Sequence, residues 1–427
     1  MTYGGIRLVS LAAAGILAAS ACGAYAQQAG EAGTDLTDVR GQSVMERARP
    51  GYDAAGIRAG GFMVYPTASV TESYDDNIYA TPTNETDDFV TTLAAGVAVN
   101  STWSRHALNL NAGLSQDFYA DNSDEDRFNW NIGAGGTLDV TSMTALSGSL
   151  SYAQRYEDRG DPSSPAAANE PIEYTLFTGA AALSQNFARM TATVGGEYLD
   201  YDYDDSATAG GVPIDQDFRD REEFIERVRL AYNISPDTNI YVEGQLDQRE
   251  YDLQPPPPAV TRDSDGRQVV VGSEFRLTNL AQGGAYIGYQ ERDYDAAAFG
   301  DTDGLAYGAN VDWFVTPLTT VIFTADQSVQ ETTVGGASGY DRQRLGVDVD
   351  HELMRNLILS GGASYGNNDF GSSPREDDLL GAHAGLLYLL NRNFDVGLRY
   401  TFEDRDSNVA AADYTRNVVA ITLTGKL

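Results

Sequence analysis

The three histidines are the residues of this sequence best suited to acid–base chemistry. His106 and His351 each adjoin a segment expected to form a tight turn, and His383 lies inside an alternating segment with no acidic residue within three positions. A hydrolytic site needs a histidine beside an acidic and a nucleophilic side chain. The sequence also contains no nucleophile elbow, phosphate-binding loop or thiol site. We therefore predict that the protein is not an enzyme and has no catalytic residues.

Clusters of carboxylates are the second feature with chemical potential. They are DNSDED at 121–126, DYDYDD at 200–205 and ERDYD at 291–295. Calcium takes such oxygen ligands, but none of the clusters has the spacing of a defined calcium loop. The favoured interpretation is acid in solvated loops, at most loosely bridged by divalent cations to phosphate groups, and calcium binding is the alternative. No metal ion and no cofactor are predicted.

The charge and the hydropathy exclude two further classes of protein. The 427 residues carry a formal net charge of −34 and no basic patch that could neutralise phosphates, so nucleic acid is not expected as a partner. Beyond the N-terminal region, no segment approaches the roughly 20 consecutive apolar residues of a membrane helix. An inner-membrane helical protein is therefore not expected either.

The first 26 residues indicate a secretory signal peptide. Arg7 supplies a weak positive region, LVSLAAAGILAAS at 8–20 is the apolar region, and AYA at 24–26 is a small-residue cleavage site. Lipidation at Cys22 is the alternative, although the residues before it lack the usual large aliphatic residue. Cleavage after Ala26 would remove the single cysteine, and export without disulfides is typical of a bacterial envelope protein.

The main body of the chain alternates between apolar and polar residues. In ALNLNAGLSQDFY at 107–119, Leu108, Leu110, Leu114 and Phe118 share one parity, and the segment then runs into the acidic cluster. A period of two places such residues on one face of a β-strand. The same alternation recurs in three other segments, at 239–250, 344–350 and 394–404.

From about Gly60 to Leu427 the chain repeats one unit, in which two long strands are joined by a tight turn and followed by a long acidic loop. This predicts an all-β fold, a transmembrane up-and-down antiparallel β-barrel of about 18 strands, with 16 as the alternative. A soluble sandwich is disfavoured by the long strands and the asymmetric connections. The predicted organisation is a signal peptide at 1–26, an extended periplasmic segment at 27–58 and the barrel at 59–427, with the proline run at 255–258 in an outer loop. The tight turns are expected near Ser104, Ser142, Asn186, Pro236, Asn279, Pro317, Arg355 and Arg392.

In such a barrel the apolar face meets lipid and the polar face meets a watery lumen, which carries both signs of charge. Tyrosines recur at the acidic ends of the strands, where an interfacial aromatic belt is expected. The predicted lumen-lining residues are Asp117, Arg227, Arg229, Glu243, Asp247, Arg249, Arg342, Arg344, Asp348, Asp350, Arg399 and Glu403. The predicted belt residues are Tyr119, Tyr156, Tyr201, Tyr251, Tyr289, Tyr365 and Tyr400.

The segment at 44–81 resembles the start of the putative β-barrel porin 2 family. The similarity lies in ERARPGYD at 46–53, GIRAGGF at 56–62, Tyr65-Pro66 and ESYDDNIYAT at 72–81, and WSRH at 103–106 is also similar. The C-terminal VVAITLTGKL looks like the assembly signal of outer-membrane barrels, except that it ends in Leu where an aromatic residue is usual. The rest of the chain is similar in architecture only.

The resemblance implies an outer-membrane β-barrel of a Gram-negative bacterium. It also implies that the gene lies near genes for polysaccharide synthesis, as those of family members often do. The expected function is therefore a conduit for export of a surface polysaccharide, and a general diffusion porin or a non-conducting structural or adhesion barrel are the alternatives. Expected partners are outer-membrane lipid, lipopolysaccharide and periplasmic polysaccharide-export proteins. The sequence leaves open the transported solute, the oligomeric state and whether residues 27–58 plug the pore.

Overall fold

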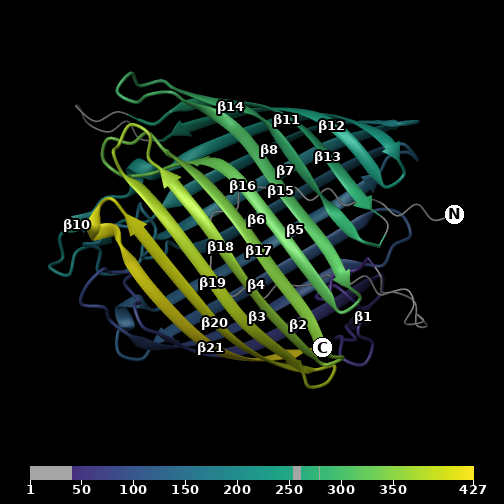
Figure 1. Cartoon of the computed structure of the whole chain (residues 1–427), viewed down its shortest axis with the longest axis horizontal. Helices are drawn as coiled ribbons and strands as arrows, with labels where there is room; N and C mark the ends of the chain where they lie inside the picture. Colours follow the sequence, from purple (N-terminus) through teal and green to yellow (C-terminus); the bar gives the residue numbers. More distant parts are fainter. Residues whose placement is uncertain (1–40, 253–260, 278) are drawn as a thin grey trace.

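The computed structural model describes residues 41–252, 261–277 and 279–427, and most of them form one closed antiparallel β-barrel (Figure 1). Eighteen strands make up the wall in these residues; each pairs with the next along the chain, and β2 pairs with β21 to close the ring. The predicted fold is confirmed, and the alternative of 16 strands is wrong. The wall strands are β2 (Phe62–Asp75), β3 (Asp88–Ser101), β4 (Ala107–Tyr119), β5 (Arg127–Asp139), β6 (Thr144–Tyr156), β7 (Glu173–Phe187), β8 (Met190–Tyr203), β11 (Arg221–Ser235), β12 (Thr238–Tyr251), β13 (Ser264–Leu277), β14 (Ala281–Tyr294), β15 (Thr302–Thr316), β16 (Thr319–Gln330), β17 (Tyr340–Met354), β18 (Leu357–Asp369), β19 (Glu376–Leu389), β20 (Phe394–Ser407) and β21 (Tyr414–Lys426).

The two ends of the barrel differ in the length of their connections. Short turns lie at one end, which we call the turn end; Pro236 and Asp237 alone join β11 to β12. Long connections lie at the other, the loop end, and include the β6–β7 loop (157–172), the β8–β11 loop (204–220) and the β16–β17 loop (331–339). Figure 1 shows the loop end on the left, marked by β10, and the turn end with the C-terminus on the right.

The small elements are β1 (Ile57–Ala59), β9 (Ser206–Ala207), β10 (Pro213–Ile214) and 3-10 turns at Ser123–Glu125, Asp217–Arg219 and Ala410–Ala412. β1 lies beside the start of β2, where Ile57 pairs with Val64. The β2–β21 pairing begins only at Thr67, opposite Lys426. β1 therefore covers the part of the β2 edge that β21 does not reach. The described residues contain no helix long and apolar enough to cross a membrane.

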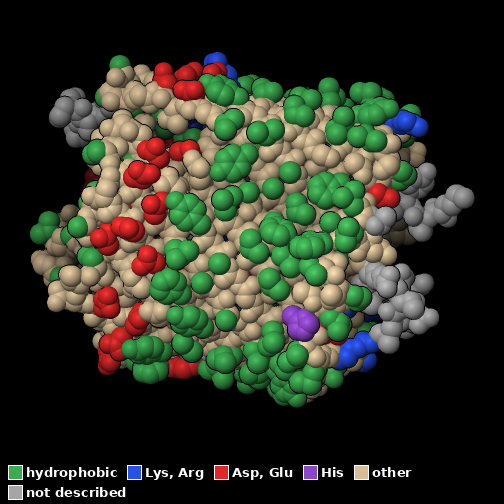
Figure 2. Space-filling model, viewed as in Figure 1, with side chains coloured by type: hydrophobic (Ala, Val, Ile, Leu, Met, Phe, Trp, Pro, Cys, Tyr) green, Lys and Arg blue, Asp and Glu red, His purple; other side chains and the backbone are tan. Residues whose placement is uncertain are grey.

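Apolar side chains cover the outside of the barrel, which is the reverse of a soluble fold. Leu110, Leu114 and Phe118 of β4 are 40%, 49% and 43% exposed and point outward together. Figure 2 shows apolar side chains over the middle of the outer wall and most of the acidic side chains toward the loop end, with basic side chains at the turn end and at the upper edge. Lipid cannot hydrogen-bond to the backbone, so such a wall is stable there only as a closed ring.

Several predictions concern residues that the structure does not describe. The signal peptide at 1–26, the cleavage site after Ala26 and the alternative lipidation at Cys22 lie outside the described residues. So do the first part of the predicted periplasmic segment, 27–40, and the proline run at 255–258. These remain predictions.

Gly283 of β14 provides a test of the wall geometry. Its φ is +152°, and an added Cβ would lie 2.1 Å from the carbonyl oxygen of Asn310 on β15. We expect Gly283→Ala to destabilise the folded barrel by about 1–3 kcal/mol, because backbone atoms cannot move aside easily. The measurement is the temperature at which the folded, faster-migrating gel band converts to the unfolded band. Gly304→Ala is the control, since a Cβ there meets nothing within 4 Å; equal effects of the two substitutions would contradict the prediction.

Candidate functional site

The lumen is the candidate site, and the structure places all twelve predicted lumen residues on its wall. In each strand they have the parity opposite to that of the exposed apolar residues; Arg227 and Arg229, for example, alternate with Val228 and Leu230 of β11, which are both 52% exposed. The twelve side chains therefore face inward.

The predicted tyrosine belt needs correction. Tyr289, Tyr365 and Tyr400 lie on the outer face, 50%, 49% and 41% exposed, and Tyr156 has the outward parity of its strand. Tyr119, Tyr201 and Tyr251 instead point into the barrel, so the prediction for these three is wrong. The reason is parity: each lies at the acidic end of its strand, as predicted, but directly follows an outward-facing residue.

The inward tyrosines pack against arginines near the loop end. The guanidinium of Arg221 lies 4.0 Å from the centre of the Tyr201 ring, and that of Arg127 lies 5.8 Å from the Tyr119 ring. The Tyr251 hydroxyl donates a hydrogen bond of 2.6 Å to Glu331 of the β16–β17 loop. These rings therefore stabilise the inner wall and a loop, where a belt residue would have met lipid headgroups.

Ion pairs join nearby strands across the inner surface from β8 to β17. Arg229 binds Glu243 at 2.5 Å and Glu274 at 2.8 Å, and Arg227 binds Glu197 of β8 at 3.0 Å. Farther along the wall, Arg342 binds Asp326 at 3.2 Å. We call this surface the charged face. Its residues are Arg227, Arg229, Glu243, Glu274, Asp326, Arg342, Arg344, Asp348 and Asp350.

Small uncharged side chains line the opposite part of the wall. Asn109 and Asn111 of β4, Asn131 of β5, and Ser149 and Ser151 of β6 alternate with outward apolar residues, and all five are nevertheless exposed. We call these five residues the neutral face. Exposed amides and hydroxyls on the inner side mean that the middle of the lumen is accessible to water.

The β6–β7 loop crosses the lumen at the loop end. It is attached near its own strands, where Arg159 forms an ion pair with the fully buried Glu125 of the β4–β5 connection. It is also attached to strands on the other side, because Arg416 of β21 binds Asp158 at 3.4 Å and Arg405 of β20 donates to the carbonyl of Gly160. The loop end of the lumen is thus narrowed by a segment held on several sides.

A second loop meets the β6–β7 loop from across the barrel. The Ser163 hydroxyl accepts a hydrogen bond of 3.3 Å from the backbone N–H of Thr333, and the Thr333 hydroxyl donates one of 3.2 Å to the Ser163 carbonyl. Thr333 belongs to the β16–β17 loop, whose Glu331 pairs with Arg249 of β12. The two loops therefore form a bridge over the mouth.

Two half-buried acids of the β6–β7 loop make the bridge sensitive to charge. Burial, followed by the charge of Glu157, raises the pKa of Asp161 to about 7. Burial also acts on Asp158, but the nearby Arg416 and Arg127 lower its pKa overall. The pKa values of two carboxyls in one loop are thus shifted in opposite directions. Of these two, only Asp161 changes its charge near neutral pH.

The turn end of the lumen is lined by residues 41–53, which we call the strap. Val44 is fully buried, and its backbone N–H donates a hydrogen bond of 3.0 Å to the Thr320 hydroxyl of β16. Arg47 and Arg49 both bind Glu352 of β17, at 3.3 Å and 3.1 Å. The sequence pattern predicted an extended periplasmic segment before the barrel, whereas residues 41–53 lie against the inner wall.

One histidine and one residue of an acidic cluster have charged partners that the sequence alone does not indicate. His383 faces inward, and its Nε2 lies 3.4 Å from Asp348 two strands away, although no acid is near it in the sequence. Glu125, from the cluster at 121–126, is buried in the Arg159 ion pair, so the interpretation of that cluster as solvated acid is wrong for this residue.

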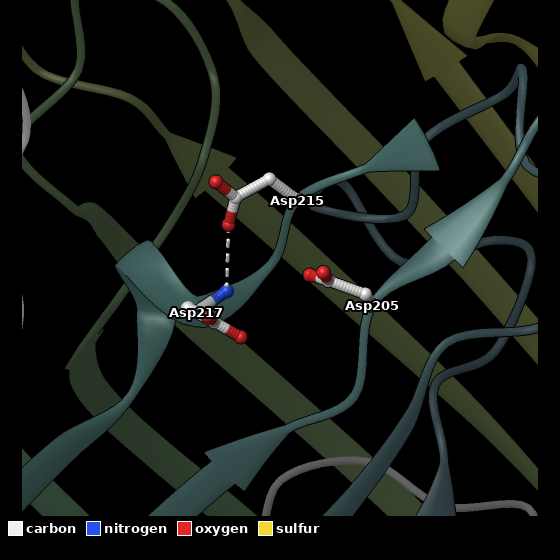
Figure 3. A group of neighbouring side chains, drawn as sticks. All are labelled: Asp205, Asp215 and Asp217. Atoms are coloured by element: carbon white, nitrogen blue, oxygen red, sulfur yellow. Dashed lines mark hydrogen bonds between the residues drawn. The ribbon is translucent and has the colours of Figure 1, made fainter. Parts of the chain in front are cut away.

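Three exposed carboxylates of the β8–β11 loop lie close together (Figure 3). Asp205, Asp215 and Asp217 each offer an oxygen within 4.8 Å of the others, and the Asp217 N–H donates to Asp215 at 3.1 Å. The charge of Asp205 is the main cause that raises the pKa of Asp217. Exposed acids often gather without an ion, so the arrangement alone assigns no metal.

Comparison with known proteins identifies one family and several barrels. Residues 49–427 match the family described as Putative beta-barrel porin 2. No curated protein matches the chain. Similar solved structures include the outer membrane protein OpdK from Pseudomonas aeruginosa (12% identity, 85% of this chain and 99% of that chain, TM-score 0.43). OccK2 (OpdF) from Pseudomonas aeruginosa is 12% identical, with 86% of this chain and 98% of that chain covered and a TM-score of 0.46. OccAB4 from Acinetobacter baumannii is 14% identical, with 85% of this chain and 98% of that chain covered and a TM-score of 0.42.

The raised pKa of Asp161 predicts that the loop bridge weakens as pH rises. In the bridged state this carboxyl holds its proton up to about pH 7, whereas in an open loop it loses the proton near its ordinary value of 3.8. The bridged state is therefore favoured at low pH, and its advantage falls between about pH 4 and pH 7 and is constant above that. The opening constant is expected to rise up to about tenfold per pH unit in this window.

The measurement is hydrogen–deuterium exchange of residues 157–172 at about pH 5 to 7.5, corrected for the intrinsic pH dependence of exchange. Asp161→Asn, which carries no titrating proton, is expected to hold the loop with the same protection at every pH. A corrected exchange rate that does not change with pH in the unsubstituted protein would show that Asp161 does not control the bridge.

Proposed function

This chain belongs to the Putative beta-barrel porin 2 family and is an outer-membrane porin-like β-barrel channel, and we propose that it exports a surface polysaccharide. In this proposal the turn end faces the periplasm and the loop end faces the exterior, as short inner turns and long outer loops are typical of such barrels. The polymer enters past the strap, follows the lumen and leaves through the mouth.

The neutral face is the observation that carries the proposal. Its five exposed amides and hydroxyls offer donors and acceptors to a hydroxyl-rich chain without attracting counter-ions. A net gain of about 0.5–1.5 kcal/mol for each hydrogen bond is enough to guide a sugar unit and too little to hold it. Conduction needs this balance, because a solute must both enter a site and leave it.

A general diffusion porin is the second candidate, because the charged face carries both signs and would suit small ions. The loop bridge favours the polysaccharide channel over a permanently open pore, since the β6–β7 loop is tied to Arg405 and Arg416 across the mouth. A non-conducting structural or adhesion barrel is the third. The water-accessible amides inside the barrel argue against it, because a filled barrel would bury them.

The proposed partners follow from the outer surface. Tyrosine hydroxyls near the loop end donate to carboxylates of the neighbouring strand, as in Tyr289–Asp303 and Tyr365–Asp378, each at 2.7 Å. Acids at this level would meet the phosphates of lipopolysaccharide, and divalent cations would have to lie between the two. At the turn end we propose contact with periplasmic polysaccharide-export proteins.

The test of the function is deletion of the gene, scored for secreted polysaccharide. Loss of secretion with intact synthesis of the polymer inside the cell supports export, and unchanged secretion contradicts it. Single-channel recording in a planar bilayer addresses the second candidate: a stable open conductance without any substrate favours a diffusion porin. A pore that opens only after the loop bridge is weakened favours the gated channel.

Replacing Asn111 and Asn131 by Leu, which has a similar volume, tests the neutral face. We expect secretion, or block of the pore by an oligosaccharide of the polymer, to fall about tenfold or more, because two hydrogen-bonding amides are lost. The conductance of small ions should change by no more than about twofold, since the width is kept. An equal loss of both activities would mean that the substitutions merely narrow the pore.

A further inference from the structure

We propose that residues 41–53 are a releasable strap, held by Glu352, that narrows the periplasmic opening of the channel and neutralises the charge of this buried carboxylate. The inference rests on the proposed function, in which the polymer enters at this end. It assigns regulation to a segment that the family resemblance contains, as ERARPGYD at 46–53, without giving it a role.

The first argument is that the strap is built into the wall of the lumen. Ser43, Val44, Arg47 and Arg49 are all at most 5% exposed. Below Val44 lies Thr320, which is 1% exposed, so the strap fully covers the inner surface of β16 at this level. A segment that covers the wall reduces the width available to a solute.

The second argument is that one carboxylate holds the strap. Glu352 is 5% exposed, and its carboxylate accepts hydrogen bonds from Nη1 of Arg47 and Nη2 of Arg49. Its single negative charge is therefore shared by two cations. The same guanidinium of Arg49 donates at 2.7 Å to the Val44 carbonyl, which folds the strap on itself. Removing the carboxylate would leave two buried guanidinium groups without a counter-charge, and such groups are strongly unfavourable.

The third argument concerns the path of the strap along the rim. Arg47 also donates to the carbonyl of Pro317 in the β15–β16 turn, and Arg392 of the β19–β20 turn donates to the carbonyl of Pro50 at 2.8 Å. These anchors lie between β15 and β20, beyond the neutral face of β4 to β6. The strap therefore thickens one side of the opening and keeps the polymer path beside the neutral face.

A glycine bend separates the strap from β1 at the end that leads into the barrel. Gly56, between the strap and β1, has a φ of +69°, and an added Cβ there would lie 2.6 Å from the Tyr65 ring, so only glycine suits this bend. At Gly51, inside the strap, an added Cβ would meet no atom within 4 Å, so the chain is loosely packed there. The contacts that would break on release are the Glu352 ion pairs, the hydrogen bond from Val44 to Thr320 of β16 and the hydrogen bonds to two turns, while the pairing between the wall strands is kept.

The decisive experiment labels a cysteine under the strap. Thr320→Cys is made together with Cys22→Ser, and the folded barrel in detergent is treated with a membrane-impermeant maleimide. The cysteine is expected to be nearly unreactive with the strap in place and to react at least about tenfold faster after Glu352→Gln. Glu157→Gln is the matched control, because it breaks a buried ion pair of the same kind, with Arg219, at the other end of the barrel and should leave the labelling slow.

Unchanged labelling in the Glu352→Gln protein, with the folded gel band preserved, would overturn the proposal. If Glu352→Gln does not fold, the double substitution Arg47→Ala and Arg49→Ala releases the strap without altering the wall, and it should give the same increase. Slow labelling in that variant would overturn the proposal equally.

Conductance separates release of the strap from a simple change of charge. Both variants are expected to raise single-channel conductance, but the double arginine variant leaves Glu352 uncompensated and should raise the permeability of K⁺ relative to Cl⁻, whereas Glu352→Gln should not. Equal shifts in ion preference would contradict the role in neutralisation. Absence of conductance in every variant would count against the proposed function, while the labelling result would still decide whether the strap is releasable.

Discussion

The need to pair backbone amides wherever the wall crosses hydrocarbon is the constraint on which the rest of the structure depends. Hydrocarbon offers no partner to an unpaired N–H or C=O group, so the sheet has to end where it began, and β21 has to meet β2. Closure in turn fixes an inside and an outside, and the two-residue period of each strand divides its side chains between them. The apolar exterior, the wet lumen and the different chemistry of the two ends all follow from this ring.

Parity made much of the fold predictable from the sequence, and it also explains where the predictions were wrong. The alternation in β4, with Leu110, Leu114 and Phe118 on one side, was sufficient to place Asp117 inside. The same count places Tyr119 inside, since it follows Phe118. The belt was predicted instead from position along the strand, which gives depth in the membrane but not the face.

Contacts between distant segments could not be predicted in this way. Glu352 lies 305 positions from Arg47, and Ser163 lies 170 positions from Thr333. No local period links such residues, because they are brought together only by the curvature of the closed wall. The burial of Glu125 was missed for a related reason: its cluster has a solvent-like composition, and only the neighbouring β6–β7 loop supplies Arg159. The arginines of ERARPGYD were the one signal for the strap in the sequence. Their partner, Glu352, is too distant along the chain to be found among neighbouring charges.

The position of the strap before β2 has a consequence for biogenesis. β2 is the first strand of the wall to be synthesised and β21 the last, so the seam between them joins residues more than three hundred positions apart and cannot form before β21 has been made. The strap, attached ahead of β2, can dock against β16 and β17 only after those strands have been synthesised. Its ion pairs with Glu352 therefore form late in folding, although its residues are among the first of the described chain to be made.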